Sequence, residues 1–154
     1  MGIYIGGTGS ANLLDDFEEG TFTPRIGPDN NNSVYESGNG SYTKIGKQVH
    51  LLMHWLNKNP NSFGSSTNVR LWNFPFNIRH GDNGNSYHAL VVPLMLYNVR
   101  WSGSEKHCFY TVNNTTEAEG LRSRDGDQWV NWSIGDWDIN GFYMDVHITY
   151  ETNA

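Results

Sequence analysis

Four carboxylate side chains crowd into five positions near the start of the chain, at Asp15, Asp16, Glu18 and Glu19. Paired carboxylates can perform general acid–base catalysis when a pocket gives them unlike environments and so separates their pKa values. Here the acids lie side by side between small residues and a turn, and the neighbouring sequence builds no pocket. We therefore expect solvated acids, or acids that meet Lys and Arg of a neighbouring chain, and a catalytic role is disfavoured.

Two histidines have a spacing that could serve a metal. On a helix, the HxxxH spacing of His50 and His54 would place both imidazoles on one face for zinc. Residues 47–57 alternate like a strand instead, which separates the two histidines by about 13 Å at ~3.3 Å per residue. Polar or interface-facing histidines are therefore favoured, and a ring of symmetry-related histidines in a trimer stays open. Asp82 is a further weak candidate ligand, although an Asx turn explains it as well.

Tryptophans and acids gather in a late segment of the chain. This combination suits sugar recognition, because a sugar ring stacks on an aromatic face while carboxylates and amides hydrogen-bond its hydroxyls. The alternative is a set of core tryptophans, which is at least as well supported for Trp132 and Trp137. The candidate ligand-binding residues are Asp125, Asp127, Trp129, Trp132, Asp136, Trp137 and Asp138.

The composition restricts the classes of partner. The chain has 154 residues and a formal net charge of −6, which argues against nucleic acid or an anionic membrane surface as the main partner. The single cysteine, Cys108, excludes an intrachain disulfide, and its apolar surroundings favour a buried thiol. No apolar run approaches the ~20 residues of a transmembrane helix, and no Gly-rich loop opens a helix. The sequence thus predicts neither membrane insertion nor a cofactor.

The elements that must position these residues are strands. Aromatic residues make up 14% of the chain and Gly occurs 17 times, which favours short strands joined by turns. The clearest strand spans residues 47–57, and both of its faces are at least half apolar, as in a strand covered on both sides. An all-β, jelly-roll-like antiparallel β-sandwich follows from this pattern. Further strands are expected over residues 21–26, 69–76, 87–99 with an irregularity at Pro93, 107–112, near Leu121, and 142–150.

Three stretches resemble the C-terminal domains of phage tail fibres and related virion appendage proteins. YIGGTGSANLLDDFEEGTFTPRI at residues 4–26 is similar to the first family motif, with Phe17 and Phe22 in place of the usual Tyr and Trp. GSYTKIG at residues 40–46 matches a second signature, and the alternating segment at residues 139–152 resembles the last strand. The stretches cover about a third of the chain, and the middle of the chain would hold the variable loops that choose a partner.

The resemblance implies a homotrimeric fibre tip on a virion that binds a host-surface glycan or protein receptor. Residues 1–20 would form a junction to a preceding fibre shaft, and residues 21–154 would form the knob domain. A trimer would also explain the aromatic excess, because one face of the sandwich could be buried against sister chains. The residues of the trimer junction would be Asp15, Asp16, Phe17, Glu18, Glu19 and Phe22, with the two phenylalanines as buried anchors.

The second signature gives its own expectations. We predict that Tyr42 and Ile45 are buried and that Gly46 lies at a bend that leads into the long strand. Two rival functions remain. A virion-associated glycan depolymerase or esterase would need an acid pair in a groove, for which only Asp125/Asp127 and Asp136/Asp138 are available. A purely structural decoration domain would have no receptor at all.

Overall fold

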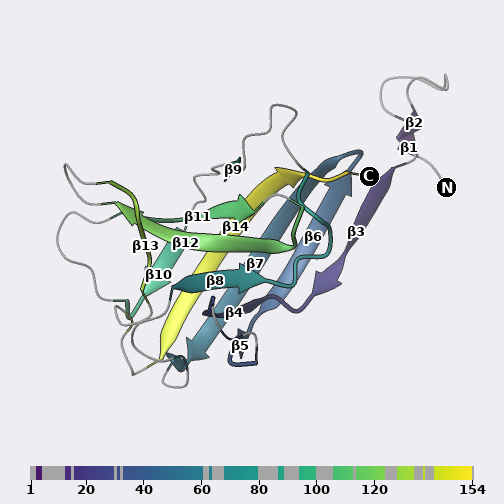
Figure 1. Ribbon diagram of the computed structural model, residues 1–154. Coiled ribbons are helices and arrows are strands. Elements are labelled where there is room, and N and C mark those ends of the chain that lie inside the picture. The colour runs from purple at the N-terminus through teal and green to yellow at the C-terminus, as the bar shows by residue number, and fades with distance from the viewer. Residues whose placement is uncertain are drawn as a thin grey trace.

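The computed structural model is built from antiparallel strands in two packed sheets (Figure 1). It describes residues 3–4, 13–14, 16–29, 31, 33–60, 63, 68–79, 87–88, 94–99, 106–112, 114–123, 128–133, 137 and 141–153. No α-helix occurs among these residues, and the expected all-β sandwich is confirmed. The strands are β1 (Ile3–Tyr4), β2 (Leu13–Leu14), β3 (Phe17–Phe22), β4 (Arg25–Pro28), β5 (Glu36–Ser37), β6 (Asn39–Ile45), β7 (Gln48–Lys58), β8 (Val69–Trp72), β9 (Tyr87–His88), β10 (Leu94–Tyr97), β11 (Lys106–Val112), β12 (Glu117–Ser123), β13 (Val130–Asn131) and β14 (Phe142–Glu151).

The two main sheets differ in their strand order. The five-stranded sheet runs β10-β14-β7-β6-β3, so that β7 is its middle strand. The seven-stranded sheet runs β5-β4-β8-β12-β11-β9, with β13 paired to β12. In Figure 1, β8 and β12 cross in front of the long strands β7 and β14. Strands β1 and β2 pair only with each other among the described strands.

The core lies between the two sheets and follows from strict alternation along β7 and β14. In β7, the inward side chains of Val49, Leu51, Met53 and Trp55 are buried, whereas their neighbours in sequence point to the opposite face. β14 contributes Phe142, Met144, Val146, Ile148 and Tyr150 in the same way. Each such side chain stabilises the fold by roughly 1.5–3 kcal/mol. The predicted strands at residues 47–57 and 142–150 are therefore confirmed.

The first long strand begins earlier than expected. Residues 17–22 already pair with β6 as the edge strand β3, and the chain then crosses at Thr23 and Pro24 into β4 of the other sheet. The predicted strand at residues 21–26 is thus divided between the two sheets. The weak segment near Leu121 is a full seven-residue strand, β12. The prediction of one strand over residues 87–99 is wrong, because β9 belongs to the seven-stranded sheet and β10 to the five-stranded sheet. Pro93 lies outside the described residues.

The second signature forms β6 and the turn that follows it. Gly46 has a φ of 58°, a left-handed conformation that glycine adopts without strain, and the predicted bend is confirmed. The expected burial of Ile45 is wrong, because its side chain is 41% exposed. Lys44 takes the inward position instead: its ammonium group meets Asp16 at 2.6 Å and lies 6.0 Å from the centre of the Phe76 ring. Tyr42 also points inward and is half-buried.

Candidate functional site

The candidate site is the outer face of the five-stranded sheet, which we define as the outward-pointing side chains of β10, β14, β7, β6 and β3. Leu52 and Leu56 on the middle strand are 47% and 53% exposed. The expectation that this strand is covered on both sides is therefore not met within the single chain. Of the nine large apolar side chains that are exposed in the described part of the chain, six lie on this face: Phe17, Ile45, Leu52, Leu56, Met95 and Tyr97.

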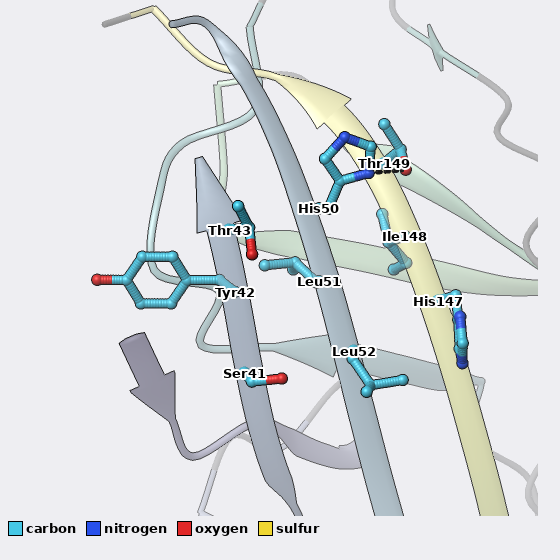
Figure 2. Close-up of a pocket in the computed structure, with 9 residues that line it drawn as sticks. All are labelled: Ser41, Tyr42, Thr43, His50, Leu51, Leu52, His147, Ile148 and Thr149. Carbon is cyan, nitrogen blue, oxygen red and sulfur yellow. Dashed lines mark hydrogen bonds between the residues drawn. The ribbon is translucent and has the colours of Figure 1, made fainter. Parts of the chain in front are cut away.

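A shallow hollow of about 310 Å³ lies near the middle of this face. Figure 2 shows the contributing side chains on three adjacent strands, with small hydroxyl residues on β6 opposite larger ones on β7. The hydroxyl oxygen of Thr149 lies 2.9 Å from Nδ1 of His50, and this hydrogen bond connects β14 to β7. The outward residues around the hollow are Ser41, Thr43, His50, Leu52, His147 and Thr149.

The hollow contains a hydroxyl group and an imidazole, which catalysis could use, but they are not in a catalytic arrangement. A hydroxyl beside an imidazole, as in Thr149 and His50, is the first half of a nucleophile–base pair. A third group that orients the imidazole is required as well, and the hydrogen bonds of His50 to described residues include no carboxylate. Asp145 instead forms a hydrogen bond with His54, its direct partner on β7. The arrangement can bind by hydrogen bonding and apolar contact.

The histidine pair considered for metal binding lies on this face. His50 and His54 both point outward from β7, separated by Leu52. Their cross-strand partners on β14 are Thr149 and Asp145, respectively. Among the described residues, no three or more His, Cys, Asp or Glu side chains are placed to hold a metal ion. The third weak candidate, Asp82, lies outside the described residues.

The acidic cluster has structural partners in its own chain. Asp16 pairs with Lys44, and its backbone carbonyl accepts a hydrogen bond from the Gly46 N–H at 2.9 Å. Glu18 accepts a hydrogen bond of 2.7 Å from the Tyr42 hydroxyl, and this bond, followed by desolvation, raises the pKa of Tyr42. Such contacts fix the edge strand on the sheet. Asp15 lies outside the described residues.

The remaining junction residues point in different directions. Phe22 points inward and packs against the core, as expected of an anchor. Phe17 is 40% exposed on the outer face of the five-stranded sheet, so the expected burial of this residue is not found within the chain. Glu19 is exposed on the same face. Phe17 and Phe22 are five residues apart in one strand, so alternation places their side chains on opposite faces. The prediction missed this because it began the strand at residue 21.

The tryptophans of the late segment have unlike environments. Trp132 and Trp137 are buried, and their rings are stacked with 5.1 Å between centroids. Both therefore belong to the core, as the alternative interpretation expected. Trp129 is 55% exposed just ahead of β13 and stays a candidate for stacking on a sugar. The four acids of the candidate set, Asp125, Asp127, Asp136 and Asp138, lie outside the described residues.

The outer face of the seven-stranded sheet carries a network of ion pairs between its own side chains. Arg70 of β8 donates to Glu117 at 2.8 Å and to Glu119 at 2.9 Å, both on β12. The Tyr110 hydroxyl of β11 donates to the other oxygen of Glu119. The only sequence signal for this network is the two-residue spacing of the glutamates, which places both on one face of a strand. Sequence reasoning did not find it, because Arg70 comes from a distant part of the chain.

Cys108 and Trp72 lie on this second sheet as well. Burial raises the pKa of the Cys108 thiol, and the expected buried thiol is confirmed. The Trp72 ring is covered by Tyr35, which packs edge-on at 6.2 Å between centroids, and the Arg25 guanidinium lies 4.2 Å from the centre of the Tyr35 ring. These contacts leave little apolar surface open around β4 and β8.

Comparison with known proteins gives a match of fold. No protein-family model matches the chain, and no curated protein matches its sequence. Within the described residues, no helix is long and apolar enough to cross a membrane. Among solved structures, the crystal structure of the Dettilon tailspike protein (gp208) is similar with a TM-score of 0.61 and 13% sequence identity. The match covers 88% of this chain and 24% of the tailspike chain, so this chain spans about a quarter of that protein's length.

Proposed function

We propose that this chain is a domain of a phage tail appendage, which assembles as a homotrimer and attaches the virion to a host-surface glycan. One coincidence carries the proposal: a chain with two motifs like those of tail fibres adopts a sandwich like part of a tailspike. The motifs lie in β3 and β6, two adjacent strands of one sheet. The acidic cluster supports a structural role over a catalytic one, since Asp16 and Glu18 each have a partner in the chain.

Trp129 is the residue that we assign to glycan contact. Its ring is large, apolar on both faces and more than half exposed. The exposed amide of Asn131 lies two residues further on, in β13, and can hydrogen-bond sugar hydroxyls. β13 pairs with β12 of the seven-stranded sheet, whose ion pairs give the site a rigid support.

Binding to a panel of purified bacterial surface polysaccharides and to intact bacteria tests this function. We expect the full chain to bind at least one of them, and Trp129→Ala to weaken binding about tenfold or more, which corresponds to about 1.4 kcal/mol. Val130→Ala is the matched control, because Val130 is exposed and directly follows Trp129 in the sequence, and this variant should bind normally. Absence of binding to every polysaccharide and cell would contradict attachment.

The same incubations separate binding from catalysis. New reducing ends in the polysaccharide would show a depolymerase, and release of acyl groups would show an esterase. Either result would replace the attachment role by an enzymatic one. The mass of the native chain tests the homotrimer: we expect three times 17.5 kDa in sedimentation equilibrium.

A further inference from the structure

We infer that the outer face of the five-stranded sheet is the surface that joins copies of this chain, with β7 next to a threefold axis. The inference rests on the proposed homotrimer and adds which surface forms it and how the strands meet. The occupant of the face is thus a second and a third copy of the chain.

The exposed apolar residues are distributed as such an assembly requires. Leu52 and Leu56 lie on the middle strand, Phe17 on one edge strand and Met95 and Tyr97 on the other. When three equal faces meet around an axis, the middle of each face is nearest to the axis, and each edge meets the opposite edge of the next copy. β10 of one copy would therefore lie against β3 of its neighbour, which accounts for apolar side chains at both edges.

The dimensions of the sheet fit this arrangement. Five strands at ~4.8 Å spacing are about 24 Å wide, which puts the middle of each of three such faces roughly 7 Å from a common axis. Side chains fill a gap of this size, since stacked sheets pack ~10 Å apart. The flat footprint is roughly 600 Å² per copy before the relief of the side chains is added, and it is shared between two neighbours, so that three copies together would cover about 1,800 Å².

The charges on the face also fit a subunit interface. No Lys or Arg occurs among its described outward residues, and interface centres are depleted in Lys and Glu. The one carboxylate in its interior, Asp145, is hydrogen-bonded to His54 on the neighbouring strand. The other acids, Glu19 and Glu151, lie at the margin, on the edge strand β3 and at the end of β14. A sheet face that stayed in water would instead be expected to alternate charged and polar residues.

The first experiment introduces charge at the middle of the face in the full chain. We expect Leu52→Glu/Leu56→Glu to weaken association by roughly a hundredfold or more, because charges would be buried near the axis. Its circular dichroism spectrum should match that of the unaltered chain, since both leucines are already half exposed. Val130→Glu is the matched control: it places the same charge on an exposed apolar residue of the other sheet and should leave the mass unchanged.

The second experiment tests how the edges meet. With Cys108→Ser as background, cysteines are placed at Phe17, at Met95 or at both, and the chains are treated with a short bis-maleimide. The double variant should give covalent trimers, and either single variant should give few linked chains. Efficient linkage of Met95→Cys alone, or a native mass of two chains, would overturn the threefold arrangement.

The outcomes distinguish this inference from the function on which it rests. If the unaltered chain is trimeric and Leu52→Glu/Leu56→Glu is trimeric too, the assigned face is wrong and the homotrimer stands. If the unaltered chain has a mass of 17.5 kDa at tens of micromolar, the homotrimer and the face are both wrong. Receptor attachment is then decided by the polysaccharide assay alone.

Discussion

The outer faces of the two sheets differ in what covers their outward side chains. On the seven-stranded sheet, Arg70 forms ion pairs with Glu117 and Glu119, and Tyr35 covers Trp72. On the five-stranded sheet, the outward leucines of β7 have no such cover within the chain. Both sheets alternate in and out with period two, so alternation fixes which side chains face outward but not what will cover them. On our proposal, the first outer face contributes to the stability of the single chain and the second joins copies of the chain.

The largest effect is expected from a comparison of two adjacent leucines on β7. Leu51 points into the core and Leu52 points outward. Leu51→Ala should lower the free energy of unfolding by about 2–5 kcal/mol at every protein concentration, because it leaves a cavity. Leu52→Ala should have an effect that grows with protein concentration, because it acts through association. Urea unfolding at several concentrations measures both, and equal, concentration-independent losses would remove the distinction between the faces.

The next effect concerns the network on the seven-stranded sheet. Arg70→Met keeps much of the side-chain volume but leaves Glu117 and Glu119 without their cation. We expect a loss of about 1–3 kcal/mol in unfolding free energy with no change in the mass of the assembly. The control is Glu151→Gln, which removes the exposed ion pair with Arg79 and should cost less than about 1 kcal/mol. If Arg70→Met changed the mass of the assembly, association would involve the outer face of the seven-stranded sheet, and our assignment of faces would be wrong.

How much of this could be predicted from the sequence depends on the range of the interaction. The inner faces of β7 and β14 were predictable because each strand contains its whole pattern. Ile45 was predicted buried because it is apolar, but the register of β6 on β7 places Lys44 inward, where it pairs with Asp16, and Ile45 outward. Contacts between residues that are far apart in the sequence decide such positions, and the sequence alone does not show which of these contacts form.

The same limit applies to the candidate site. Its middle strand was predicted, with His50 and His54 as polar or interface-facing residues. The hollow was not predicted, because it needs the small residues of β6 beside β7 and β14. The ion pair between Arg70 and Glu117 joins residues 47 positions apart, and no local sequence pattern predicts it. Conversely, Trp132 and Trp137 have the composition of a sugar site but belong to the core, because burial depends on the sheet behind them.

A smaller effect is expected from Tyr150, whose side chain points into the core from β14. Burial raises the pKa of Tyr150, whose hydroxyl donates to the Phe76 carbonyl at 2.9 Å. Because the folded state favours the protonated phenol, its stabilising contribution is complete below about pH 10 and is lost progressively as the pH rises further. Thermal melts between pH 9 and pH 11.5 should show a steeper alkaline loss for the unaltered chain than for Tyr150→Phe. Parallel curves would contradict the assigned burial.

The last comparison uses thiols to report on the two faces directly and should leave stability almost unchanged. Cys108 lies on the opposite side of β11 from the core residue Phe109, yet it is buried, and this burial raises the pKa of its thiol. Since the thiolate is the reactive form, the native chain should react with a thiol reagent far more slowly than the unfolded chain at the same pH.

A cysteine in place of Leu52, with Cys108→Ser as background, should behave differently because its exposure depends on assembly. We expect it to react rapidly in dilute solution, where copies separate, and slowly at high concentration, where the outer face of the five-stranded sheet is covered. The rate of Cys108 itself should be the same at both concentrations, because its cover comes from its own chain. Absorbance of the released thiol reagent measures both rates. If the Leu52→Cys rate were equally fast at all concentrations, the open face would remain open, and the contrast between the two sheets would reduce to a difference in surface composition.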